Sequence, residues 1–120
     1  MVNEYVIAQT NLFIKRGDCK NYTLYFEDDD GDRINITGWV LFFTVKTNID
    51  DPDSAAKISK TITIHTDPIN GESQIALSSI DTVDVVNYCY DIQYKTLTGS
   101  IKTIVEGYVT ISKDVTQRIS

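Results

Sequence analysis

The chain has 120 residues, the common size of a single domain, and 42% of them are hydrophobic while 23% are charged. This length and composition allow one buried core and exclude a disordered chain. A formal net charge of −6 makes nucleic acid an unfavourable partner, because binding to phosphates depends on Lys and Arg.

Alternation of apolar and polar residues with a period of two is the dominant pattern, and it predicts β-strands rather than helices. In chain order we expect seven strands, at about residues 11–15, 20–27, 38–47, 57–65, 75–77, 87–96 and 101–112. Turn residues such as Asp30-Gly31 and Asn70-Gly71 separate them, which is typical of a sandwich or barrel. The short connection between Tyr94 and Ile101 favours antiparallel pairing of the last two strands.

One face of each expected strand carries large apolar side chains and should form the core. The inward set is Tyr22, Leu24, Phe26, Trp39, Leu41, Phe43, Val45, Ile58, Ile62, Ile64, Ile75, Leu77, Tyr88, Tyr90, Ile92, Tyr94, Val105, Gly107, Val109 and Ile111. Lys60 shares a face with Ile58, which indicates a bulge or an edge strand. We expect one domain over residues 1–120, with 1–10 as an N-terminal arm and 112–120 as a tail or connection.

The acidic run at residues 27–32 could ligate calcium, which prefers several carboxylate oxygens around a glycine turn. Its spacing does not fit an EF-hand, because aligning Gly31 with the loop glycine places Phe26 at the first ligand position. A solvated hairpin tip is the alternative interpretation, and the acidic loop at residues 50–53 is interpreted in the same way. We predict no cofactor and no metal.

Catalysis has little support in the residues present. His65 is the only histidine and is expected to point into solvent, and no motif supplies a nucleophile with its base. We therefore predict no enzyme and no catalytic residue. Cys19 and Cys89 flank Trp39 in the order of an immunoglobulin disulfide, but by parity both thiols point away from the core, so we expect no bridge between them.

No apolar run is long enough to span a bilayer, and residues 1–10 lack the pattern of a signal peptide. We therefore expect no membrane partner.

Motifs at turns and on strand faces extend over nearly the whole chain. They are, in order, Ile14-Lys15-Arg16-Gly17-Asp18, Asp30-Gly31-Asp32, Ile34-Asn35-Ile36-Thr37-Gly38-Trp39, Asn70-Gly71, Ile75-Ala76-Leu77-Ser78, Asp81-Thr82, Tyr88-Cys89-Tyr90-Asp91-Ile92 and Glu106-Gly107-Tyr108-Val109-Thr110-Ile111. This series resembles the N-terminal domain of the baseplate upper protein family of tailed phages and prophages. The chain departs from the family at Cys19, where relatives tend to have Thr or a small residue.

The resemblance implies an all-β fold, a seven-stranded antiparallel immunoglobulin-like β-sandwich without enzymatic activity. Its expected function is that of a structural and interaction module in a tail baseplate, made in the bacterial host cytoplasm and located in the virion. It would bind itself or other baseplate proteins, as a homo-oligomer in the assembled particle. The alternative is a carbohydrate- or receptor-binding sandwich whose outward tyrosines, Tyr5, Tyr25 and Tyr108, would stack on sugars.

The candidate partner surface is one outer sheet face. In the immunoglobulin-like arrangement the third, sixth and seventh strands share a sheet. Their outward apolar or weakly polar residues are Val40, Phe42, Cys89, Ile104 and Tyr108. Around them we expect Thr44, Asp91, Gln93 and Glu106, which would form an apolar centre with a polar rim. The alternative is that these are scattered surface residues, or that the segment from Ser112 covers them.

Overall fold

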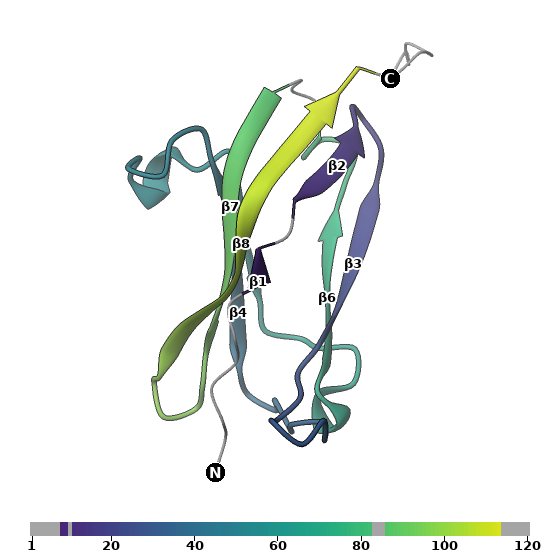
Figure 1. Ribbon diagram of the computed structural model, residues 1–120, viewed down its shortest axis with the longest axis vertical. Helices are drawn as coiled ribbons and strands as arrows, with labels where there is room; N and C mark the ends of the chain where they lie inside the picture. Colours follow the sequence, from purple (N-terminus) through teal and green to yellow (C-terminus); the bar gives the residue numbers. More distant parts are fainter. Residues whose placement is uncertain (1–7, 10, 83–85, 114–120) are drawn as a thin grey trace.

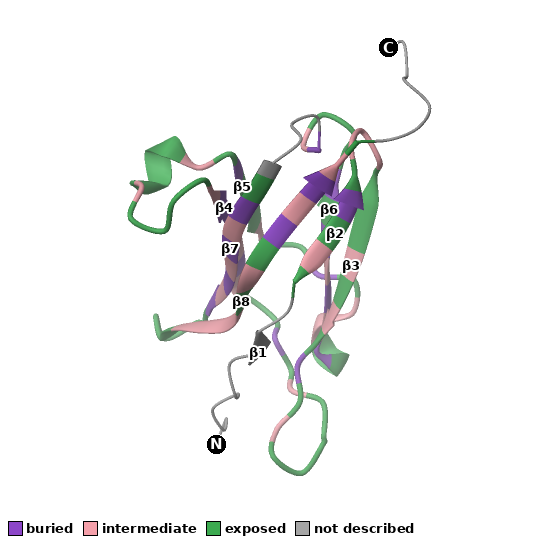
Figure 2. Ribbon diagram, turned by 45° about the horizontal axis from the view of Figure 1, so that its top comes forward, coloured by how far each residue is buried: buried purple, intermediate pink, exposed green. Residues whose placement is uncertain are grey.

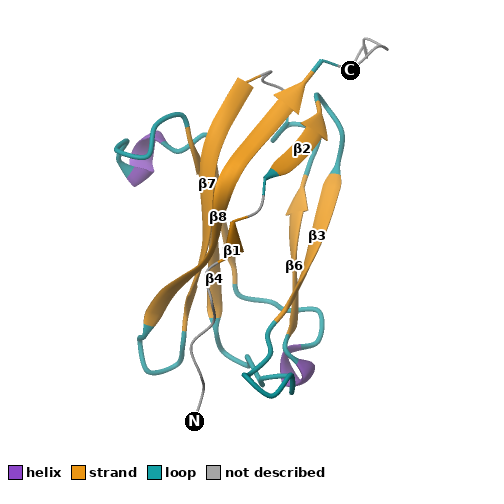
Figure 3. Cartoon of the chain, in the orientation of Figure 1, coloured by secondary structure: helices purple, strands orange, loops and turns teal. Residues whose placement is uncertain are grey.

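The computed structural model describes residues 8–9, 11–82 and 86–113, and it consists of two β-sheets (Figure 1). The larger sheet contains β1 (Ala8–Gln9), β2 (Leu12–Lys15), β4 (Val40–Lys46), β5 (Ile58–Ile62), β7 (Val86–Lys95) and β8 (Ile101–Ser112). The smaller sheet contains β3 (Lys20–Tyr25) and β6 (Glu72–Leu77). Two short 3-10 helices, η1 (Asp53–Ala55) and η2 (Pro68–Asn70), lie in connections (Figure 3). The prediction of an all-β chain is confirmed.

The larger sheet has the strand order β1-β8-β7-β4-β5, and β2 also pairs with β8. As predicted, β4, β7 and β8 share this sheet, and the last two strands pair in antiparallel fashion. β1 and β2 run parallel to β8, so the prediction of an entirely antiparallel sandwich is wrong. β1 lies within the predicted N-terminal arm. Of the predicted C-terminal tail, residues 114–120 lie outside the described part of the chain.

Buried residues alternate with more exposed ones along the strands, as the colours of β7 and β8 show (Figure 2). The main cluster combines residues of β2, β4, β5, β6, β7 and β8. A second cluster lies where β4 begins and contains Phe26, Ile36, Trp39, Leu41 and Tyr94. The Trp39 ring stacks on Tyr94 with centroids 4.6 Å apart, and the Phe26 ring lies nearly perpendicular to both. The inward faces predicted for residues 38–47 and 87–96 are confirmed.

Two predictions fail at the end of β5, because the strand ends at Ile62. Ile64, predicted inward, is 87% exposed, whereas His65, predicted to point into solvent, is buried. The His65 Nε2 atom lies 2.8 Å from the carbonyl oxygen of Trp39, and its Nδ1 atom lies 2.8 Å from Ser73 Oγ. Because a carbonyl only accepts, Nε2 donates that bond. The imidazole ring therefore connects the entry to β4 with β6 of the other sheet.

The first part of β8 contains a β-bulge. Ile92 lies opposite Val105, but the next residue, Gln93, lies opposite Thr103. Ile104 is the extra residue, and it packs against both core clusters. The predicted outward position of Ile104 is therefore wrong, because one inserted residue changes which side chains face the core.

Candidate functional site

The outer face of the larger sheet, which points away from β3 and β6, carries four of the five apolar or weakly polar residues predicted for the partner surface, namely Val40, Phe42, Cys89 and Tyr108. Val40 and Phe42 of β4 are half-buried there, and Tyr108 of β8 is 62% exposed. The structure adds Phe13 of β2, which is 71% exposed and lies opposite Thr110 of β8. Phe13 was not among the predicted residues, because its strand is only four residues long and the sequence does not show which strand it pairs with.

The polar residues of this face lie between the aromatic residues and not around them. β7 runs between β4 and β8, so Asp91 has Thr44 opposite it on one side and Glu106 on the other. In a neighbouring row, Gln93 lies opposite Phe42. The predicted apolar centre with a polar rim is therefore wrong. The central strand, β7, places Asp91 and Gln93 in the middle of the face, and strand order is not visible in the sequence.

A groove of about 1050 Å³ follows this face. Among the described residues, its lining includes the carboxylates of Asp53, Asp91 and Glu106 and one ammonium group, that of Lys46. The Lys46 Nζ atom lies 2.8 Å from Asp53 Oδ1 and donates a 2.8 Å hydrogen bond to the carbonyl oxygen of Asp51. The described residues therefore give the groove an excess of two negative charges, and Lys46 is held at the β4–β5 connection.

Asp91 lies in an unfavourable environment for a charged carboxylate. Burial raises the pKa of Asp91, the charges of Asp53 and Glu106 raise it further, and the charge of Lys46 and a hydrogen bond from Gln93 lower it. That hydrogen bond is long, with 3.4 Å between Gln93 Nε2 and Asp91 Oδ2. The balance is a raised pKa, so ionisation of Asp91 at neutral pH costs the fold some stability.

We expect Asp91→Asn to raise the melting temperature at pH 7. With a folded pKa above the unfolded one, the carboxyl group contributes stability that is fully present below its unfolded pKa and is lost as pH rises through the folded pKa. The advantage of the variant should therefore shrink as the pH falls through the acidic range. Thermal melts at several pH values measure this, with Asp29→Asn in an exposed loop as the charge-matched control. A lower melting temperature for Asp91→Asn at pH 7 would contradict the expectation.

The two cysteines occupy the positions expected from parity. Cys19 is exposed and directly precedes β3, which belongs to the smaller sheet. Cys89 is half-buried on the outer face of the larger sheet, opposite Tyr108, and its thiol donates a 3.3 Å hydrogen bond to the carbonyl oxygen of Lys46. The lack of a disulfide between them stays a prediction.

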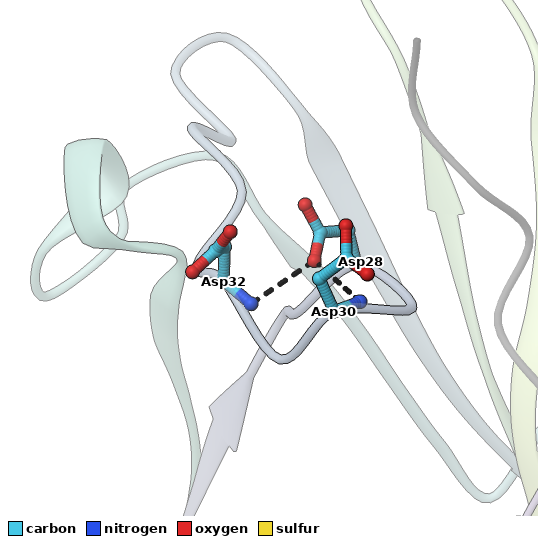
Figure 4. Close-up of side chains that lie close together, drawn as sticks. All are labelled: Asp28, Asp30 and Asp32. Carbon is cyan, nitrogen blue, oxygen red and sulfur yellow. Dashed lines mark hydrogen bonds between the residues drawn. The ribbon is translucent and has the colours of Figure 1, made fainter.

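The acidic run at residues 27–32 forms a turn after β3 (Figure 4). Carboxylate oxygens of Asp28, Asp30 and Asp32 lie within 4.8 Å of one another. Asp28 Oδ1 accepts hydrogen bonds from the backbone N–H groups of Asp30, at 2.9 Å, and Asp32, at 3.0 Å. Glu27 and Arg33 close the turn with a β-bridge and a 3.2 Å ion pair. These contacts account for the loop as a hairpin tip.

A sugar-binding surface would need exposed aromatic rings that converge. Tyr25 of β3 is 55% exposed, but the Arg33 guanidinium carbon lies 4.3 Å from the centroid of its ring and covers one face. Tyr108 is on the other sheet, and Tyr5 lies outside the described residues. The two described tyrosines therefore do not form one surface.

Comparison with solved structures shows that the fold is shared with a phage domain. The N-terminal domain of ORF48 of phage TP901-1 matches with a TM-score of 0.55 and 11% sequence identity. The match covers 94% of this chain and 100% of that chain. No family model and no curated protein matches the sequence. Within the part of the chain that the structure describes, no helix has the length and apolar character to cross a membrane.

Proposed function

We propose that this chain is a non-enzymatic structural module of a phage or prophage tail baseplate, which holds receptor-binding parts through protein–protein contacts. The observation that carries the proposal is the fold match of nearly the whole chain to a complete phage domain. The motifs that resemble the baseplate upper protein family support the same place in the virion.

The partner surface in this proposal is the outer face of the larger sheet. On a sheet with one face in the core, the outward residues of a free monomer are expected to be polar. Here Phe13, Phe42 and Tyr108 occupy that face, two of them largely exposed, and aromatic residues are enriched at protein interfaces. The groove on this face is a hollow that a segment of a partner protein could enter.

We expect the tagged parent chain to be detected at the tail tip of phage particles by immunoelectron microscopy. The double variant Phe42→Ser with Tyr108→Ser should be missing from the particles, while circular dichroism of the purified chain stays unchanged, because neither side chain belongs to the core clusters. The matched control is Ile64→Ser with Ile69→Ser, two exposed apolar residues between β5 and β6, which should be incorporated normally.

Labelling of particles away from the tail would contradict the proposed function. Normal incorporation of the folded Phe42 and Tyr108 double variant would instead place the partner surface elsewhere, at the loops or at a sheet edge.

A further inference from the structure

We propose that the groove on the outer face binds a basic polypeptide segment of a partner protein, with an arginine or lysine side chain of that segment at Asp91. The inference rests on the proposed docking function of this face and specifies the chemistry of the occupant.

The charges of the groove favour a cationic occupant. Asp91 and Glu106 lie directly opposite each other on β7 and β8, so two carboxylates stand side by side on the outer face. Lys46, the single cation among the groove residues that the structure describes, already contacts Asp53 and the backbone of the β4–β5 connection. A positive side chain entering the groove would therefore meet a local excess of negative charge, and such complementarity directs association and selects partners.

The aromatic residues around Asp91 suit the stem of a long basic side chain. Phe42 lies on one side, in β4, and Tyr108 lies on the other, in β8, with Phe13 beyond it on β2. Arginine and lysine bury their aliphatic stems along apolar surface while the charged end remains in polar surroundings, and guanidinium groups also stack on aromatic rings. A segment that combines basic and apolar residues would match both properties of the groove.

The environment of Asp91 should also contribute to the free energy of binding a cation. Desolvation and the charges of Asp53 and Glu106 raise the pKa of Asp91 more than Lys46 and Gln93 lower it, so ionisation is less favourable here than for an ordinary aspartate. A cation beside it would reverse that balance and bring the pKa down. The stability that Asp91 costs the free chain would thus be recovered in the complex.

The same charges disfavour a two-fold dimer through this face. In a two-fold contact the same patch of both copies meets itself, so carboxylates would face carboxylates. The net charge of −6 also opposes the close approach of two copies. The occupant is therefore a basic polypeptide, and a homo-oligomer would have to form through a different surface.

The experiment is a nuclear magnetic resonance titration of the isotope-labelled chain with the peptide acetyl-Thr-Arg-Leu-Arg-Thr-amide. A second peptide with citrulline in place of both arginines has the same shape without the charges. We expect saturable amide shifts at Thr44, Asp91 and Glu106, and about tenfold weaker binding of the citrulline peptide, because a charge-assisted hydrogen bond is lost. Asp91→Asn should weaken binding of the arginine peptide similarly. Asp30→Asn, which removes the same charge outside the groove, should leave it unchanged.

Three results would overturn the inference, and they separate it from the proposed function. Equal binding of both peptides in the groove would remove the charge selection while leaving the face as a docking surface. Shifts confined to other parts of the chain would also remove the outer face from the proposed function. A dimer in sedimentation that Phe42→Ser with Tyr108→Ser dissociates would show a second copy in the groove, which supports docking but excludes the basic partner.

Discussion

Trp39→Ala should reduce the free energy of unfolding by about 3–5 kcal/mol, the usual cost of removing a large buried aromatic ring. The ring is 5% exposed, stacks on Tyr94, and lies nearly perpendicular to the Phe26 ring, with the two centroids 5.7 Å apart. Tyr94 belongs to β7, and Phe26 follows β3 of the other sheet. The walls of the cavity that the substitution leaves are therefore held by separate elements and cannot easily close it. The melting temperature should fall by roughly 10–20 °C. The expected loss of free energy is a large part of the total stability of a domain of this size.

Circular dichroism is the suitable measurement, because Trp39 is the only tryptophan and its fluorescence is lost in the variant. Trp39→Phe keeps a ring and should give an intermediate loss, which makes the test informative if the alanine variant does not fold. Phe13→Ala removes a ring that is 71% exposed and should change stability by less than about 1 kcal/mol. A Trp39→Ala melting temperature equal to that of the parent would contradict the assignment of Trp39 to the core.

Gly71→Ala is the second substitution for which we expect a large loss. Gly71 caps η2 with a left-handed backbone, at φ +68°, where an L side chain costs about 1–2 kcal/mol. A Cβ atom would lie 2.6 Å from the carbonyl oxygen of Ile34 and 2.7 Å from that of Phe26. Both atoms are backbone and cannot rotate away, so the overlap should add about 1–3 kcal/mol. Denaturant unfolding measures the sum.

Gly99→Ala is the matched control for this overlap. Gly99 also has a positive φ, +93°, in the turn between β7 and β8, but a Cβ atom there meets no atom of the described residues within 4 Å. It should therefore show only the backbone cost of about 1–2 kcal/mol. Equal losses for the two variants would contradict the close approach of the Phe26 and Ile34 segments to Gly71.

The central strands could be predicted from the sequence because their alternation is long and regular. In β4 and β7, every second residue from Leu41 to Val45 and from Tyr88 to Tyr94 is buried, so a period of two assigns each face without tertiary information. Prediction failed where a tertiary contact overrides the pattern. His65 is buried because the strand has already ended at Ile62, and Ile104 turns inward because a bulge inserts one residue.

The candidate site was predictable only in part. The alternation within β4 and within β8 is enough to predict that Phe42 and Tyr108 point away from the core. The structure places both on the outer face. The position of Asp91 between them depends on strand order, and the addition of Phe13 depends on a parallel pairing with a distant strand. Neither leaves a local signal, because pairing partners are chosen by tertiary packing and not by the residues of one strand.

The parallel pairing of β2 with β8 also bears on how a newly synthesised chain folds. Asn11, just before β2, accepts a hydrogen bond from the backbone N–H of Tyr108, 97 residues later in the chain. Contacts between such distant segments close large loops, and domains dominated by them fold slowly. While the ribosome is still making β8, β2 and β7 both lack the strand that lies between them, and unpaired edges of this kind favour aggregation. Synthesis of β8 is therefore the step that completes the larger sheet. Until then, the nascent chain must avoid association through the edges of β2 and β7.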